Sequence, residues 1–128
     1  MKEIGLNLYS IRNLIGTEEE LLATAQKLKD MGYSFVQYSG ATFDTKRIKR
    51  MVDEVGMPVR LTHMDKDRLL TETEKVCEEN LSFGNTNIGL GAMSAEIIND
   101  ENKCKANIFD ILSIVYSDCS NIIFIIRF

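Results

Sequence analysis

Short apolar runs recur along the chain at a nearly constant interval. They begin near Ile4, Phe35, Val59 and Asn87, which are 31, 24 and 28 residues apart. Each of the first three runs is followed by a pattern typical of an amphipathic helix. A strand and a helix repeated at this interval predict a parallel α/β fold, and repetition without a second domain is typical of a (β/α) barrel.

The length of the chain limits how much of a barrel it can form. A complete (β/α)8 barrel typically needs about 250 residues, whereas this sequence has 128. We therefore expect a single domain over residues 1–128, an incomplete TIM barrel of about four to five βα units that corresponds to the N-terminal half of a (β/α)8 barrel. A receiver-like or flavodoxin-like open sheet would also match the length and is the alternative. A phosphate-accepting receiver should have acidic residues at the end of its first strand, and residues 6–10 contain none.

Residue types at the expected helix ends support the repeat. In a capping box, a Ser or Thr hydroxyl and a Glu side chain three residues later satisfy each other's free backbone donors, and a glycine often ends the helix. These signals occur in order along the chain: capping boxes at Thr17–Glu20 and Thr71–Glu74, a start at Asp44 or Thr45, and glycines at Gly32, Gly56 and Gly84. They predict helices within 17–32, 44–56 and 71–84.

The charge balance argues against a nucleic-acid partner. The formal net charge is −4 and the isoelectric point is about 5.0, whereas a nucleic-acid-binding surface is basic. A basic cluster, Lys46–Arg50, is followed one turn later by Asp53 and Glu54. We therefore interpret this cluster as the solvated face of the second helix.

The cysteines and the N-terminus predict a cytoplasmic protein. Cys77, Cys104 and Cys119 are odd in number and form no C-x-x-C pair, so we expect small buried thiols in a reducing compartment. The N-terminus leads directly into an amphipathic strand and lacks the apolar core of a signal peptide. A membrane anchor near the C-terminus is disfavoured, because Asp110 and Asp118 would each cost about 2.5–3.5 kcal/mol near a bilayer centre.

The ends of the expected strands are the places to look for a ligand site. In parallel α/β folds, ligands bind at the carboxyl ends of the strands. His63, the only histidine in the sequence, stands at such an end, with Asp65 two residues further on. An imidazole there could bind a metal, hold a substrate hydroxyl or transfer a proton. The alternatives are a histidine merely hydrogen-bonded at a strand end and an aspartate that closes a turn or caps a helix.

The last part of the chain predicts one more helix and one more strand. Apolar residues between 104 and 119 recur at helical spacing. The final run, residues 121–128, is a candidate fifth strand. Within it, Ile122–Ile126 is uncharged and β-prone, which makes it an aggregation hazard at an open sheet edge. Before this region, Gly89 and Gly91 lack the third glycine of a dinucleotide fingerprint, so they favour a glycine-rich strand end over a cofactor site.

Three motifs, at Ile4–Arg12, Met31–Gly40 and Leu61–His63, occur in an order and at a spacing that resemble a known family. They are similar to the opening three units of the xylose isomerase-like TIM-barrel family, which contains sugar phosphate isomerases and epimerases. Residues 87–93 also resemble the family's fourth strand. The resemblance covers about residues 3–94.

The resemblance implies a site for a sugar or sugar phosphate in the mouth of the barrel. The residues it implies for substrate binding are Tyr9, Ser39, Thr62 and His63. It also implies a divalent metal (Mn, Mg or Zn) in the full-length family, with His63 as a possible ligand, and metal-assisted proton transfer between adjacent carbons. Many relatives have Glu where Gln37 stands; the amide keeps hydrogen-bonding capacity but cannot act as a base or a charged ligand.

Residues 95–128 depart from the family pattern. The main metal ligands and acid/base glutamates of the family come from strands five to eight, and residues 108–128 contain no His or Glu. We therefore expect a sugar phosphate isomerase/epimerase-like protein that binds no metal tightly and is inactive on its own. The alternative is a non-catalytic α/β module that self-associates or binds a partner through an open sheet edge.

Overall fold

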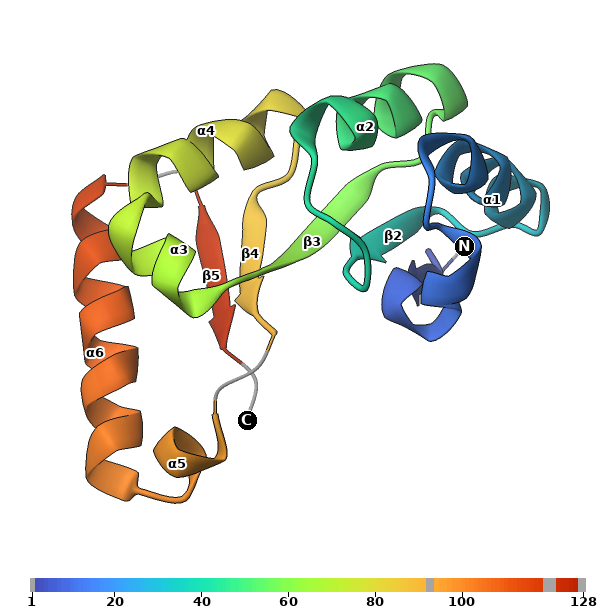
Figure 1. Cartoon of the computed structure of the whole chain (residues 1–128). Helices are drawn as coiled ribbons and strands as arrows, with labels where there is room; N and C mark the ends of the chain where they lie inside the picture. The colour runs from blue at the N-terminus through green and yellow to red at the C-terminus, as the bar shows by residue number, and fades with distance from the viewer. Residues whose placement is uncertain (1, 92–93, 119–121, 127–128) are drawn as a thin grey trace.

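A computed structural model of the chain describes residues 2–91, 94–118 and 122–126, in which strands and helices alternate (Figure 1). The strands are β1 (Gly5–Asn7), β2 (Phe35–Tyr38), β3 (Val59–Met64), β4 (Asn87–Leu90) and β5 (Ile123–Ile126). The α-helices are α1 (Glu18–Asp30), α2 (Thr45–Arg50), α3 (Lys66–Thr71), α4 (Thr73–Ser82), α5 (Ala95–Ile98) and α6 (Glu101–Asp118). A 3₁₀ helix, η1 (Leu8–Leu14), follows β1, and a π-helical turn, η2 (Met51–Val55), continues α2.

The strand order confirms the predicted parallel βα repeat. All five strands are parallel and lie in the order β1-β2-β3-β4-β5, so each strand pairs with its neighbour in sequence. A flavodoxin-like sheet would have the order 2-1-3-4-5, with the first strand inside. The sequential order excludes that alternative, and it is the order in which the strands of a (β/α) barrel follow one another.

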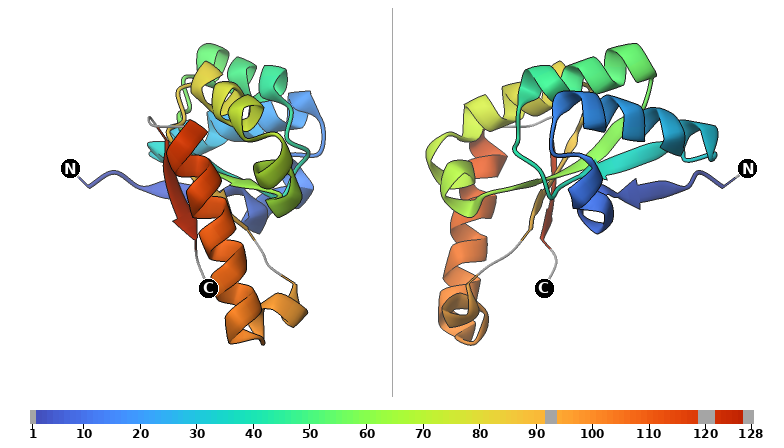
Figure 2. Two further views of the ribbon diagram at one scale, coloured as in Figure 1. Left: turned by 90° about the vertical axis from the view of Figure 1, so that its left-hand side faces the viewer. Right: turned by 45° about the vertical axis from the view of Figure 1, so that its right-hand side comes forward.

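The two faces of the sheet differ in burial. Helices α1, α2, α4 and α6 form a continuous layer, with contacts from α1 to η2, from α2 to α4 and from α4 to α6 (Figures 1 and 2). The strand residues buried beneath this layer are Val36, Tyr38, Val59, Thr62, Met64, Ile88 and Leu90. The alternate residues Phe35, Gln37, Leu61 and His63 are only partly buried. The hydrophobic core therefore lies between the sheet and the helices, whereas the opposite face remains open.

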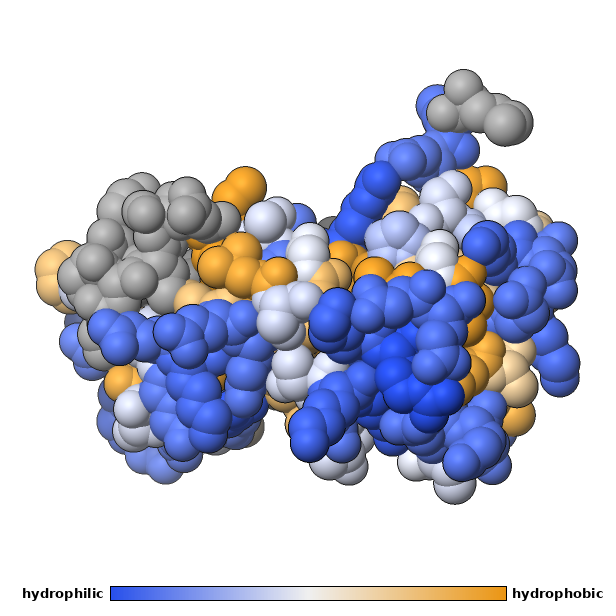
Figure 3. All heavy atoms as spheres, turned by 90° about the horizontal axis from the view of Figure 1, so that it is seen from above, coloured by the Kyte–Doolittle hydropathy of each residue, from blue (hydrophilic) through white to orange (hydrophobic). Residues whose placement is uncertain are grey.

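The outer surface of the helical layer is mainly hydrophilic, with strips of apolar residues between the polar areas (Figure 3). On α2 and η2, Lys49 pairs with Asp53 and Arg50 pairs with Glu54, at distances of 2.8 and 2.7 Å. This part of the basic cluster is solvated, as predicted. The prediction is wrong for Arg47, which is 7% exposed. Its guanidinium donates to the carbonyls of residues 15–17, where the chain bends before α1. The carbonyls of Ile15 and Gly16 precede the helix, and that of Thr17 also accepts the Leu21 amide of α1.

One of the two predicted capping boxes is present. The Glu20 side chain accepts from the Thr17 amide at 2.9 Å, and the Thr17 hydroxyl accepts from the Glu20 amide at 3.1 Å. The box predicted at Thr71 and Glu74 is wrong. Asp65 begins a separate helix, α3, so Thr71 falls in its last turn and donates its hydroxyl to the carbonyl four residues earlier.

The C-terminal part of the described chain contains the predicted helix and strand. Ile111 of α6 is 1% exposed, and β5 pairs with β4. Ile123 of β5 is 62% exposed at the sheet edge. No helix within the described residues is both long enough and apolar enough to span a membrane.

The cysteines differ from the expectation of free thiols. Cys77 of α4 is buried and disulfide-bonded, so that expectation is wrong for this residue. Cys104 of α6 is a free thiol and is partly buried. Cys119 lies outside the described residues.

Candidate functional site

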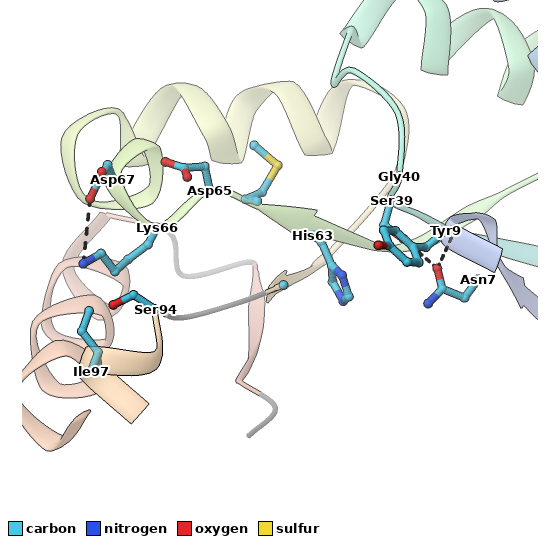
Figure 4. A pocket seen from close by; sticks show the side chains of 12 residues that line it. Asn7, Tyr9, Ser39, Gly40, His63, Asp65, Lys66, Asp67, Ser94 and Ile97 are labelled. Atoms are coloured by element: carbon cyan, nitrogen blue, oxygen red, sulfur yellow. Dashed lines mark hydrogen bonds and ion pairs between the residues drawn. The ribbon is translucent and has the colours of Figure 1, made fainter. Parts of the chain in front are cut away.

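A cleft of about 710 Å³ opens at the carboxyl ends of the first four strands (Figure 4). Its lining comes from the turns after β1 and β2, the end of β3 with the start of α3, and the segment between β4 and α5. The residues that line it are Asn7, Tyr9, Ser39, Gly40, His63, Met64, Asp65, Lys66, Asp67, Gly91, Ser94 and Ile97. Tyr9, Ser39 and His63, three of the four residues implied by the family resemblance, are among them.

Asn7, Tyr9 and Ser39 lie together at one end of the cleft (Figure 4). Strand β1 ends at Asn7, whose side-chain oxygen accepts from the Tyr9 amide at 3.0 Å and so caps η1. The same oxygen accepts from the hydroxyl of Ser39 at 2.6 Å. Both hydrogen bonds use the side-chain oxygen of Asn7, so its NH₂ group remains as a donor to a ligand. The hydroxyl of Ser39 already donates to Asn7, so its oxygen remains as an acceptor.

The backbone at Gly40 allows this corner to form. Gly40 has a φ of +82°, and a side-chain carbon there would lie 2.9 Å from Cα of Tyr9. Only glycine lets the turn after β2 pass so close to η1. The Tyr9 ring, in turn, lies under the Arg12 guanidinium, 4.5 Å from the ring centre, and Arg12 donates to the carbonyl of Tyr9.

His63 extends from β3 toward the middle of the cleft (Figure 4). Its Nε2 lies 2.9 Å from Nε2 of Gln37 on the neighbouring strand β2. On the other side, a side-chain carbon at Gly91 would lie 3.1–3.2 Å from the Cβ, Cγ and Nδ1 atoms of His63. The ring is therefore enclosed between an amide side chain on one strand and a bare backbone on the next.

Charged groups gather at the far end of the cleft. The Asp65 carboxylate accepts from the Arg68 amide at 3.1 Å and caps α3, which confirms the helix-cap interpretation of this residue. Lys66 donates to the Asn107 side-chain oxygen on α6 at 3.2 Å, and its Nζ lies 3.9 Å from the Asp67 carboxylate. One ammonium and two carboxylates thus line this end, although one of the carboxylates is already used in capping.

Thr62 does not line the cleft. Neighbouring residues of a strand point to opposite faces, so Thr62 faces the helices when His63 faces the cleft. Its side chain is fully buried, and its hydroxyl donates to the Asn80 side-chain oxygen of α4 at 2.7 Å. The structure therefore corrects the expectation that Thr62 binds the substrate.

The residues of the cleft do not fit the divalent metal that the family resemblance implies. Among the described residues, no three His, Cys, Asp or Glu side chains come together as a possible metal site. Zinc typically takes three or four protein ligands. His63 Nε2 contacts Gln37, and the Asp65 carboxylate caps α3.

The sequence patterns missed several residues of the cleft. Asn7 is not among the predicted site residues, although an amide within the apolar run that begins at Ile4 was a visible signal. Lys66, Ser94 and Ile97 come from segments with no strand-end pattern of their own. Residues 92 and 93, at the end of the expected fourth strand, lie outside the described residues.

No protein-family model matches the chain, and no curated protein matches it. The chemistry of the cleft is therefore inferred from its own residues.

Proposed function

We propose that the chain binds a sugar or sugar phosphate in this cleft, as the substrate-binding N-terminal half of a sugar phosphate isomerase/epimerase-like (β/α) barrel. The observation that carries the proposal is the row of hydroxyl, amide and imidazole groups at the carboxyl ends of neighbouring parallel strands. This is the place where barrel enzymes bind their substrates.

The polar groups at the β1 and β2 end suit a polyol. A sugar hydroxyl both donates and accepts a hydrogen bond. The NH₂ group of Asn7 can donate to it, and the Ser39 oxygen, whose own proton goes to Asn7, can accept from it. Tyr9, which is 54% exposed, offers a partly apolar ring and a hydroxyl at this end of the cleft.

Lys66 at the far end favours an anionic group on the ligand. It is the lysine among the residues lining the cleft, and its side chain keeps 25% of its surface accessible. A phosphate there would accept a charge-assisted hydrogen bond. The opposing charge of Asp67 weakens the preference, so both a sugar and a sugar phosphate are included in the proposal.

The described residues support binding more strongly than turnover. Moving a proton between carbons requires a general base within hydrogen-bond reach and stabilisation of the charge that develops. Within the described part of the cleft, no cluster of metal ligands supplies that stabilisation. We therefore propose that the isolated chain binds its ligand without converting it.

The test is a titration of the isotope-labelled protein with ketoses and ketose monophosphates, followed by NMR. We expect saturable shifts at the cleft and no product. Tyr9→Phe and Ser39→Ala should each weaken binding about 2–10-fold, the equivalent of one hydrogen bond. The matched controls are Tyr33→Phe and Ser82→Ala, which lie outside the cleft. Absence of binding, or an equal loss of affinity in the control variants, would refute the proposed binding site. Turnover by the isolated chain would refute the proposal that it binds its ligand without converting it.

A second candidate function is self-association through the open edge of β1. Among the described strands, β1 pairs with β2 alone. Beside it, an apolar groove of about 490 Å³ runs along η1 and α1 and includes Leu14 and Met31, which are 51% and 73% exposed. Exposed apolar surface next to an unpaired strand is a site for association with another chain.

Sedimentation velocity over a range of protein concentrations tests this candidate. If a second copy binds the groove, Met31→Glu should shift the protein toward the monomer. Leu81→Glu, at another exposed apolar position, should not. A wild-type chain that stays monomeric at high concentration and binds no hydrophobic dye would count against self-association.

We propose that the chain is located in the cytoplasm. The disulfide at Cys77 provides the test, because the cytoplasm keeps thiols reduced. Alkylation of the protein in intact cells, followed by mass spectrometry, should find Cys77 labelled. A Cys77 that is protected until a reductant is added would place the chain in an oxidising compartment.

A further inference from the structure

His63 is held on both sides by groups that carry no charge. Gln37 and His63 lie on the open face of neighbouring parallel strands, where Gln37 is in register with Leu61 and His63 follows two residues later on the same face. The side-chain nitrogens of the two residues are 2.9 Å apart. On the β4 side, His63 is in register with Gly89, and Gly91 lies against its ring.

The Gln37 contact determines where the imidazole proton is. An amide nitrogen can only donate a hydrogen bond, so Nε2 of His63 must accept. A neutral imidazole has one N–H group, and that proton must then be on Nδ1. A protonated ring would have N–H groups at both positions and would lose this hydrogen bond.

The lack of a side chain at Gly91 determines where the ring can lie. A methyl group there would approach three atoms of His63 to 3.1–3.2 Å, closer than most carbon contacts. A larger residue would displace the ring toward β2 and disturb the geometry of its hydrogen bond with Gln37. Gly91 therefore has a specific steric role at the end of β4, beyond that of a flexible residue in a turn.

We propose that Gln37 and Gly91 are positioning residues that hold His63 in the cleft as a neutral imidazole with its proton on Nδ1 and its Nε2 bonded to Gln37. His63 then acts as an oriented neutral group, and Nε2 is not available as a metal ligand unless Gln37 moves. The role in ligand binding rests on the proposed function, whereas the proton position does not.

The experiment is a long-range ¹H–¹⁵N correlation spectrum of the imidazole at mildly alkaline pH. His63 is the only histidine in the sequence, so the signals need no assignment. In the wild type we expect a pyridine-like Nε2 and a pyrrole-like Nδ1. Gln37→Glu should place a proton on Nε2, because a carboxylate can only accept, and Gln37→Leu should change the imidazole shifts from those of the wild type.

Two further variants separate positioning from general destabilisation. Gly91→Ala should change the imidazole shifts while the far-UV circular dichroism stays that of the wild type. Gln26→Leu is the matched control, because Gln26 donates to Asp30 on the exposed face of α1, remote from the cleft. It should leave the imidazole spectrum unchanged.

A wild-type spectrum with the proton on Nε2 would overturn the proposal, since the amide of Gln37 would then be reversed. Identical spectra for the wild type and Gln37→Leu would overturn it as well. These outcomes are independent of sugar binding: a chain that binds no sugar but shows the expected tautomer would refute the proposed function alone.

Discussion

The buried polar cluster beneath β3 gives the sharpest prediction for stability. Thr62, Asn80 and Asn85 are all fully buried. The Asn80 side-chain oxygen accepts from the Thr62 hydroxyl at 2.7 Å and from the Asn85 amide group at 2.8 Å. Asn85 also donates to the Asn87 carbonyl at 2.8 Å. The cluster joins β3, α4 and the start of β4 on the side of the sheet opposite the cleft.

Asn80→Ala leaves the Thr62 hydroxyl buried without its acceptor. An unsatisfied buried donor costs about 1–3 kcal/mol, and each further lost hydrogen bond has a net cost of about 0.5–1.5 kcal/mol. The amide group of Asn85 keeps its hydrogen bond to the Asn87 carbonyl, so Asn85 loses only one of its hydrogen-bond partners in this cluster. We therefore expect Asn80→Ala to lower the free energy of unfolding by about 2–4 kcal/mol.

Thr62→Val provides the comparison, because it removes the donor that Asn80→Ala leaves unpaired. The Asn80 oxygen still accepts from Asn85 in this variant, so the expected loss is about 1 kcal/mol. In the double variant the unpaired hydroxyl is absent, and the loss should be smaller than the sum of the two single losses. Asn102→Ala on exposed α6 is the control and should change stability by less than about 0.5 kcal/mol.

Urea unfolding followed by far-UV circular dichroism measures these differences in the free energy of unfolding, and its dependence on urea concentration should be the same in all variants. Equal losses for Asn80→Ala and Thr62→Val, or strictly additive losses in the double variant, would refute the reasoning from an unpaired donor. Thr62→Val should also leave the affinity for a sugar ligand unchanged. A lower affinity at wild-type fold would mean that Thr62 contacts the ligand after all.

Three further changes test other parts of the structure. Arg47→Met should lower the free energy of unfolding, measured in urea titrations, by about 2–3 kcal/mol, because it removes the donor to the carbonyls of residues 15–17. Lys46 is exposed, so Lys46→Met is the control and should have little effect. The hydrogen bond from Arg60 lowers the pKa of Glu3 below its ordinary value of 4.5, so this pair stabilises the fold above that pH and loses its effect as the pH falls below it. Glu3→Gln should therefore make the free energy of unfolding less dependent on pH in this acidic range. An unchanged dependence on pH in urea titrations would contradict this expectation. Lys66→Met should weaken binding of a ketose phosphate but not of the free ketose, as isothermal titration calorimetry would show; equal losses for both would exclude an anionic subsite.

The repeat of strands and helices was predictable because each element carries its own local signal. The four apolar runs, the capping box at Thr17 and the helix-ending glycines depend on residues close together in sequence. They depend little on the rest of the fold. The strand order could not be read from this pattern, since open sheets and barrels both alternate strands with helices.

The candidate site was predictable only in part. His63 and Ser39 were found because they lie at or near the ends of strands, and strand ends meet at one edge of a parallel sheet. Thr62 was assigned to the wrong face because a one-residue difference along a strand reverses the direction of the side chain. Lys66 and Ser94 reach the cleft from segments that the fold brings beside it.

The sequence by itself determined that this chain alternates strands and helices and has its imidazole at a strand end. Only the tertiary structure decided which groups surround that imidazole. The contact between Gln37 and His63, the bare backbone of Gly91 and the burial of Arg47 all join residues distant in sequence. Such contacts depend on strand register and on the close packing of neighbouring elements, and no local pattern of residues encodes them.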